Sequence, residues 1–168
     1  MPPGYVVDCS AADGNTIYQD AKKDGNVANF TTVSVPAGTV KDNFTGLIWQ
    51  QAGTSTKMNW YNALGYCALL DLGSYPVGSW RLPSNVELIT FADYNCSGVS
   101  ANCTGNYINI NFTQTSWDSG VYGYWSSTTT PSMTGNAYVL DSATGSIDGW
   151  NSKNTITSYG VRCVRSGN

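Results

Sequence analysis

Two short helical patterns lie in the first half of the chain, and alternating strand patterns fill most of the second half. In the stretch NWYNALGYCALL, apolar residues recur at intervals of three and four, which places them on one face of a helix. They are Trp60, Ala63, Leu64, Cys67 and Leu70. Helices followed by short antiparallel strands predict an α+β fold. We detect no internal repeat.

A second helix is expected after Ser84, in the stretch GSWRLPSNVEL. Glu87 follows this serine by three residues and precedes the apolar residues Leu88 and Ile89. This spacing is that of a capping box, in which each side chain binds a backbone N–H group at the start of the helix. The pattern therefore predicts a helix that begins just after Ser84.

Strands are predicted on both sides of these helices. Residues 39–51 alternate around Thr45 and Gly46, which indicates a strand, a turn and a strand. Later strand patterns are GYWSSTTT, NAYVLDSATGSIDGW with a turn at residues 143–145, and YGVRCVR. In the last stretch, Val161 and Cys163 should point to one side and Arg162 and Val164 to the other.

The first 38 residues carry little periodicity. We predict that residues 1–38 form an irregular N-terminal arm, which packs on the domain or extends from it, and that residues 39–168 form the domain. The length of 168 residues suits one domain with a hydrophobic core.

Five cysteines, with abundant Tyr, Asn and Thr, favour an exported, oxidised protein. Cys96 and Cys103 lie close together in a polar loop and are expected to pair. A bridge between Cys67 and Cys163 would close a loop of about 100 residues and contribute ~4–5 kcal/mol. The alternative is that these thiols are reduced and pack as small hydrophobic groups. Cys9 is left unpaired or pairs with a neighbouring subunit.

The low content of charged residues limits the classes of molecule that this chain can bind. Charged residues make up 11% of the chain, the net charge is −3, and no run of Lys or Arg occurs. Nucleic acid, anionic membranes and polyanions are therefore disfavoured partners. No apolar run is long enough to cross a membrane. The opening MPPGYVVDCS lacks the features of a signal peptide, so the expected export signal is not part of this chain.

The stretches VKDNFTGLIWQ, NWYNALGYCALL, WRLPSNVEL, YWSST and YGVRCVR occur in an order that resembles the C-terminal domain of the Legionella collagen-like adhesin. The resemblance covers roughly residues 39–165. This bacterial family is related in fold to C-type lectins and to formylglycine-generating enzymes. The resemblance implies a C-type-lectin-like fold in which two helices flank small twisted antiparallel sheets. It also implies a disulfide between Cys67 and Cys163.

Within this fold Arg81 is interpreted as structural. A guanidinium group beside an indole ring can stack, and its five donors can satisfy carbonyl groups or a carboxylate. Glu87 and Asp42 are the candidate partners, and the alternative role of Arg81 is ligand binding. Four tryptophans inside the matching stretches are predicted to lie in the core. They are Trp49, Trp60, Trp80 and Trp125.

Catalysis is not expected. The chain has no histidine, which excludes Ser-His-Asp and Cys-His nucleophile systems and imidazole metal sites. A carboxylate pair is compatible with 11 acidic residues, but Asp141 and Asp148 merely flank a hairpin turn. The tripeptides of calcium-dependent sugar sites are missing. We predict no catalytic residue, no metal site and no cofactor, although a structural calcium ion is compatible with the fold.

Binding is the remaining function. The C-terminal hairpins carry aromatic rings for rigid contact area and amides for adaptable hydrogen bonding. Relatives of this fold place ligand contacts in the equivalent region, by analogy of position. The predicted ligand-binding residues are Tyr122, Asn136, Tyr138, Trp150, Asn151, Lys153, Asn154 and Tyr159. The alternative is that these residues are ordinary polar hairpins with half-buried rings.

Two functional hypotheses follow. In the first, the protein is a non-catalytic extracellular or cell-surface adhesion module that binds a glycan or a protein. In the second, it is a structural subunit of a fibre, a pilus-like assembly or a matrix, and it binds copies of itself. The collagen-like relative forms a trimer, which makes a homo-oligomer a reasonable expectation for either hypothesis.

Overall fold

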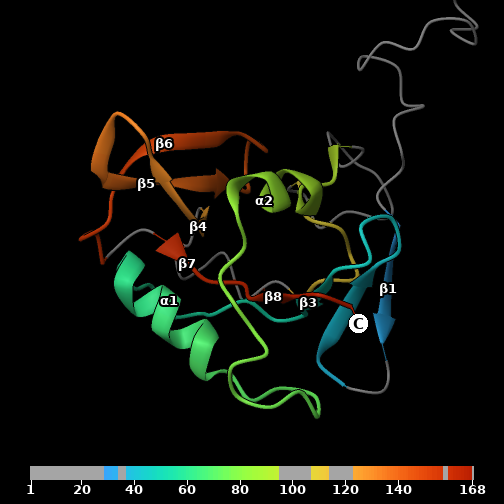
Figure 1. Ribbon diagram of the computed structural model, residues 1–168. Coiled ribbons are helices and arrows are strands. Elements are labelled where there is room, and N and C mark those ends of the chain that lie inside the picture. Colours follow the sequence, from blue (N-terminus) through green and yellow to red (C-terminus); the bar gives the residue numbers. More distant parts are fainter. Residues whose placement is uncertain (1–28, 34–36, 95–106, 114–122, 157–158, 168) are drawn as a thin grey trace, which may run out of the picture.

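The computed structural model describes residues 29–33, 37–94, 107–113, 123–156 and 159–167. Within these ranges the chain forms two helices, α1 (Trp60–Leu69) and α2 (Asn85–Phe91), and eight strands in two four-stranded sheets. Figure 1 shows both helices packed against the strands. The predicted α+β class is confirmed.

The first sheet is antiparallel throughout and has the strand order β1-β2-β3-β8. Its strands are β1 (Phe30–Val33), β2 (Thr39–Asp42), β3 (Ile48–Gln50) and β8 (Val164–Arg165). The strand, turn and strand predicted for residues 39–51 are therefore present. Strand β1 falls inside the segment 1–38 that was expected to be irregular. That expectation is wrong for these four residues, because pairing with β2 buries Phe30.

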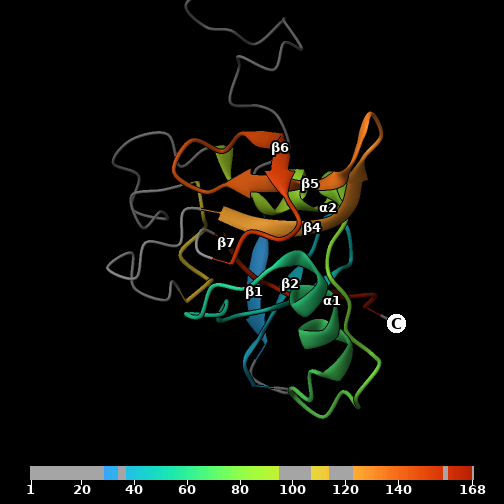
Figure 2. The ribbon, with the colours of Figure 1, turned by 90° about the vertical axis from the view of Figure 1, so that its left-hand side faces the viewer.

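The second sheet has the strand order β6-β5-β4-β7. Its strands are β4 (Gly123–Thr130), β5 (Met133–Asp141), β6 (Ile147–Ser152) and β7 (Tyr159–Gly160). Strands β4, β5 and β6 pair antiparallel, as expected, whereas β7 pairs with β4 in parallel. In Figure 2 the strands β6, β5 and β4 lie above α1 and the first sheet.

Neighbouring residues of the central strand β4 enter two different hydrophobic clusters. Tyr124 belongs to a first cluster with Leu88 and Phe91 of α2. Trp125 belongs to a second cluster with Ala63 and Cys67 of α1. Because successive side chains of a strand point to opposite faces, the two helices cover opposite sides of β4.

The closing segment, residues 161–164, has the alternation of side chains between two faces that the sequence predicted. Val161 and Cys163 pack in the second cluster, whereas Val164 packs in the first. The Arg162 guanidinium lies 5.2 Å from the ring of Phe91, on the side of the first cluster. All four residues of the segment are buried. Residues 161–164 therefore contact both clusters, the one that includes residues of α2 and the one that includes residues of α1.

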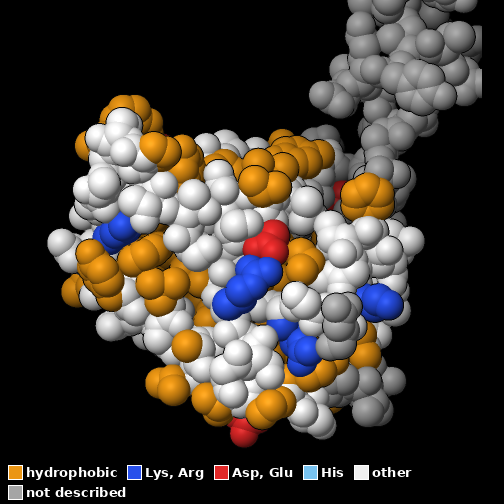
Figure 3. All heavy atoms as spheres, in the orientation of Figure 1, with side chains coloured by type: hydrophobic (Ala, Val, Ile, Leu, Met, Phe, Trp, Pro, Cys, Tyr) orange, Lys and Arg blue, Asp and Glu red, His pale blue; other side chains and the backbone are white. Residues whose placement is uncertain are grey.

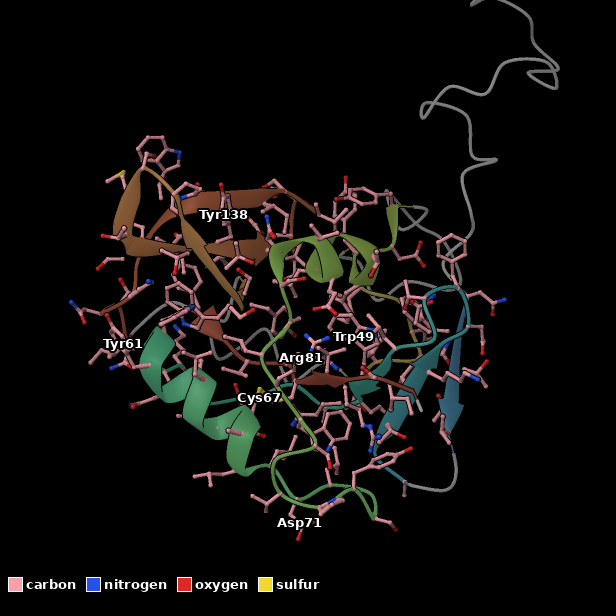
Figure 4. The ribbon with its side chains drawn as sticks, in the orientation of Figure 1. Trp49, Tyr61, Cys67, Asp71, Arg81 and Tyr138 are labelled. Atoms are coloured by element: carbon pink, nitrogen blue, oxygen red, sulfur yellow. A yellow bond between two sulfur atoms is a disulfide. The ribbon has the colours of Figure 1, made fainter. Side chains whose placement is uncertain are left out.

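A disulfide between Cys67 and Cys163 joins α1 to this closing segment, as predicted. The two Cα atoms lie 5.5 Å apart, and both side chains are fully buried. Figure 4 shows Cys67 pointing from α1 towards the interior. The predicted pairing of Cys96 with Cys103 and the prediction for Cys9 concern residues outside the described ranges.

The capping box at the start of α2 is present. The Glu87 amide donates to Ser84 Oγ at 3.2 Å, and Glu87 Oε2 accepts from the Ser84 amide at 2.8 Å. Arg81 donates to both carboxylate oxygens of Glu87, at 2.7 and 2.6 Å. These bonds, with those from Ser84, lower the pKa of Glu87 from its usual value, against the opposing effect of burial. Glu87 is therefore the partner of Arg81.

Asp42, the other candidate partner of Arg81, instead accepts hydrogen bonds from the backbone of a turn. A turn of the same kind begins at Asp141. The sequences DNFTGLI from Asp42 and DSATGSI from Asp141 both connect adjacent strands. Each aspartate Oδ1 accepts from the backbone amides two and three residues later, at 2.8–3.4 Å. Gly46 and Gly145 have φ values of 75° and 72°. Sequence analysis missed this local repeat because its members share only four of seven positions.

The two turn glycines provide a matched test of backbone strain and steric crowding. A Cβ at Gly46 would meet nothing within 4 Å, whereas one at Gly145 would lie 2.9 Å from the Tyr107 ring. The left-handed backbone alone costs an L residue about 1–2 kcal/mol. We expect Gly46→Ala to lose about that much and Gly145→Ala about 1–3 kcal/mol more. Urea unfolding of both variants measures the difference, and equal losses would contradict it.

Three of the four tryptophans predicted in the core are buried, namely Trp49, Trp80 and Trp125. Trp60 packs against the second cluster but is only partly buried. Its indole Nε1 donates to the Ser126 carbonyl at 2.7 Å. This bond fixes the first turn of α1 to β4, so the ring serves the fold although part of it is exposed.

Candidate ligand-binding surface

Seven of the eight predicted ligand-binding residues are described, and Tyr122 lies outside the described ranges. Asn136 and Tyr138 lie on β5, Trp150 and Asn151 on β6, Lys153 and Asn154 in the chain after β6, and Tyr159 at the start of β7. The β5–β6 hairpin, the segment after it and β7 thus carry all seven. Their side chains do not share one role, however.

Trp150 is the most exposed large hydrophobic side chain in the described part of the chain, at 74% of its possible exposure. Large aromatic side chains in a domain of this size usually find a place in the core. The other described tryptophans are buried or partly buried. Trp150 therefore needs an explanation in terms of its strand.

A β-bulge in β6 presents this side chain. Ala137 pairs with Asn151 and Val139 with Asp148, so Tyr138 stands opposite two residues, Gly149 and Trp150. A Cβ on Gly149 would lie 2.7 Å from Tyr138 Cε1, which shows that the tyrosine ring lies against the glycine backbone. Bulges re-aim side chains, often beside functional sites. A glycine inside a strand pattern was the sequence signal for this feature.

Hydrogen bonds hold the bulge in place. The Trp150 amide donates to Asp148 Oδ1 at 3.0 Å, and Asn151 Nδ2 donates to the Asp148 carbonyl at 2.9 Å. The Tyr159 hydroxyl donates to Asn151 Oδ1. Burial, and then the charges of Asp148 and Asp141, raise the pKa of Tyr159, so this donor stays protonated at neutral pH.

Asn151 and Tyr159 consequently support the bulge from within. The nitrogen and the oxygen of the Asn151 side-chain amide are both hydrogen-bonded within the protein. The Tyr159 ring lies 4.7 Å from the ring of Trp125, edge to face, in the second cluster. These two predicted contact residues position Trp150, and their polar groups are occupied.

The prediction that Lys153 belongs to the contact surface is wrong. Its side chain is buried, and Nζ donates to Thr129 Oγ1 and to the Thr134 carbonyl, both at 2.8 Å. Nζ also lies 4.2 Å from the centre of the Trp60 ring. The Trp60 amide donates to the Lys153 carbonyl at 2.9 Å, which places the start of α1 beneath this turn. The lysine therefore links α1 to the hairpins.

Asn136 keeps hydrogen-bonding capacity at the surface. Its Nδ2 lies 3.9 Å from Met133 Sδ, and a thioether is a weak acceptor. Met133, which sequence analysis did not select, is 40% exposed at the start of β5. We define the hairpin surface as Met133, Asn136, Tyr138 and Trp150. Asn154, the remaining predicted contact residue, is exposed and follows the strand that carries Trp150.

The hairpin surface includes no Lys, Arg, Asp or Glu. Of the six described basic side chains, Lys153 and Arg162 are buried, Arg81 is paired with Glu87, and the Arg165 guanidinium lies 3.6 Å from the Tyr75 ring. Lys57 is partly buried, and Lys41 is exposed on β2 of the other sheet. Figure 3 shows scattered charges and hydrophobic side chains over the β4–β5 hairpin and α2. Figure 4 places Tyr138 at this end of the molecule and Asp71 at the other.

A family model described as the Lcl C-terminal domain matches residues 38–165, which include the hairpin surface and the disulfide. The chain belongs to the Lcl C-terminal domain family. The resemblance found in the sequence is thereby confirmed. No curated protein matches the chain. In the described part of this Lcl C-terminal domain, neither helix has the length and apolar character needed to cross a membrane.

Proposed function

We propose that this Lcl C-terminal domain is a non-catalytic adhesion module, exported to the cell surface or the extracellular space. It binds a glycan or a protein with the hairpin surface. One observation carries the proposal: Trp150 is exposed on a bulge whose backbone and flanking side chains are fixed by hydrogen bonds. A rigid exposed indole loses little conformational entropy when it binds.

The proposed fold is C-type-lectin-like. It is supported by two helices on opposite sides of β4 and by a disulfide from α1 to the closing segment. That binding is not coupled to catalysis is supported by the complete absence of histidine from the sequence. The hairpin surface as defined also includes no titratable group other than the Tyr138 hydroxyl.

A direct test compares two exposed aromatic residues. Trp150→Ala removes the hairpin indole, whereas Phe44→Ala removes a ring that is 65% exposed in the β2–β3 turn. Binding to a printed glycan array and to immobilised extracellular-matrix proteins should weaken about 30-fold for Trp150→Ala, the effect of a 2 kcal/mol hot spot. Phe44→Ala should bind like the parent protein.

Equal binding by the two variants would contradict the proposed site. The alternative hypothesis, a structural subunit, makes a different prediction. It requires discrete oligomers or fibres in light scattering and electron microscopy, and an unchanged assembly in Trp150→Ala. If the protein assembles but binds neither the glycan array nor the immobilised matrix proteins, that result would favour the structural subunit.

A further inference from the structure

We propose that the hairpin surface binds a neutral saccharide, with one sugar ring stacked on the Trp150 indole and its hydroxyl groups bonded by Asn136. This inference rests on the proposed function and names the ligand class of that site. It follows from three features of the described residues: the presentation of the indole, the polar groups beside it, and the distribution of charge.

The indole provides a flat face for stacking. An aromatic ring carries negative potential on its faces, which attracts the polarised C–H groups on the apolar side of a sugar ring. Trp150 is 74% exposed, and its amide is fixed to Asp148 Oδ1 at 3.0 Å. The backbone that carries the indole is therefore ordered before a ligand arrives, which reduces the ordering cost of binding.

Asn136 supplies hydrogen bonds at the correct place in the sheet. It lies two residues before Tyr138 on the same strand, so both side chains are on the same face. Tyr138 in turn stands opposite the bulge that carries Trp150. An amide offers both donors and an acceptor, which is what hydroxyl groups require. The weak Met133 contact at 3.9 Å leaves these groups available for a ligand.

Charge selects against anionic ligands. The hairpin surface includes no Lys or Arg, and the nearest described lysine in the sequence, Lys153, is buried. The carboxylate next to the bulge, Asp148, belongs to an exposed residue. A sulfate or carboxylate on the sugar would be repelled by this negative charge, and no residue of the hairpin surface carries a positive charge to offset it. A neutral saccharide avoids that repulsion.

The experiment uses the full chain and follows the indole N–H signal of Trp150 by NMR, assigned with Trp150→Phe. Probes are neutral hexasaccharides of glucose, N-acetylglucosamine, xylose and mannose, and the matched polymers dextran and dextran sulfate. We expect at least one neutral probe to shift this signal. Affinity, measured by calorimetric titration because Trp150→Ala lacks this signal, should fall about tenfold or more in Trp150→Ala and remain unchanged in Phe44→Ala. Unchanged thermal unfolding of Trp150→Ala would show that the loss is not due to misfolding.

Each other result overturns the inference. If only dextran sulfate binds, or if neutral probes bind Trp150→Ala as tightly as the parent, the ligand class is wrong. If no saccharide binds but an immobilised protein does and depends on Trp150, the proposed adhesion site stands and the saccharide inference fails. If nothing binds through Trp150, both proposals fail.

Discussion

Replacing both Cys67 and Cys163 by alanine is expected to lower the free energy of unfolding by about 4–5 kcal/mol. The bridge closes a loop with a sequence separation of 96 residues, so its removal releases much conformational freedom in the unfolded chain. Both sulfur-bearing side chains are fully buried between α1 and the closing segment. Alanine avoids placing a polar group there.

Urea unfolding, followed by far-ultraviolet circular dichroism, measures the loss. Cys9→Ala is the matched control, since Cys9 is predicted to have no partner within the chain. We expect its unfolding to match that of the parent protein. A double alanine variant that unfolds at the same urea concentration as the parent would show that the bridge contributes nothing to stability.

Replacing Arg162 by methionine should be nearly as damaging, with a loss of about 3–5 kcal/mol. Arg162 is fully buried, and its guanidinium donates to the carbonyl groups of Gln50 at 2.8 Å, Gln51, and Thr113 at 3.3 Å. Methionine fills similar volume but has no donor. Each buried carbonyl that is left without a partner costs about 1–3 kcal/mol.

Lys41→Met provides the comparison, because Lys41 is an exposed side chain on β2. Surface substitutions of this kind usually change stability by about 0.5 kcal/mol or less. Arg162→Lys should not restore stability, since an ammonium group cannot reach the same set of carbonyls with a planar fork. Similar unfolding curves for Arg162→Met and Lys41→Met would show that the hydrogen bonds of Arg162 do not stabilise the fold.

Features set by neighbouring residues could be predicted from the sequence. The capping box of Ser84 and Glu87 depends on two side chains three residues apart, and it is present as expected. The helical spacing of Ala63 and Cys67 identified the buried face of α1. The pairing of Cys67 with Cys163 came from the expected elements and from the family resemblance, and it is also present.

The candidate site was predicted only in part. Trp150 and Asn136 lie at the surface as expected, but the bulge at Gly149 that presents the indole was not foreseen. A bulge depends on the register between two strands, and no single strand pattern contains that register. Asn151 was selected for its side chain alone, without the hydroxyl of Tyr159 that occupies it.

The sequence by itself determined the α+β class, the start of α2, the turns and the alternation of the closing segment, because each is set by residues close together in the chain. Only the tertiary structure decided which charged side chains are buried. Lys153 and Arg162 are polar by type, yet both are buried. Their partners, such as the carbonyl of Gln50, lie far away in the sequence and converge only when the sheets and helices pack. Burial of a charge is favourable only where such partners meet it.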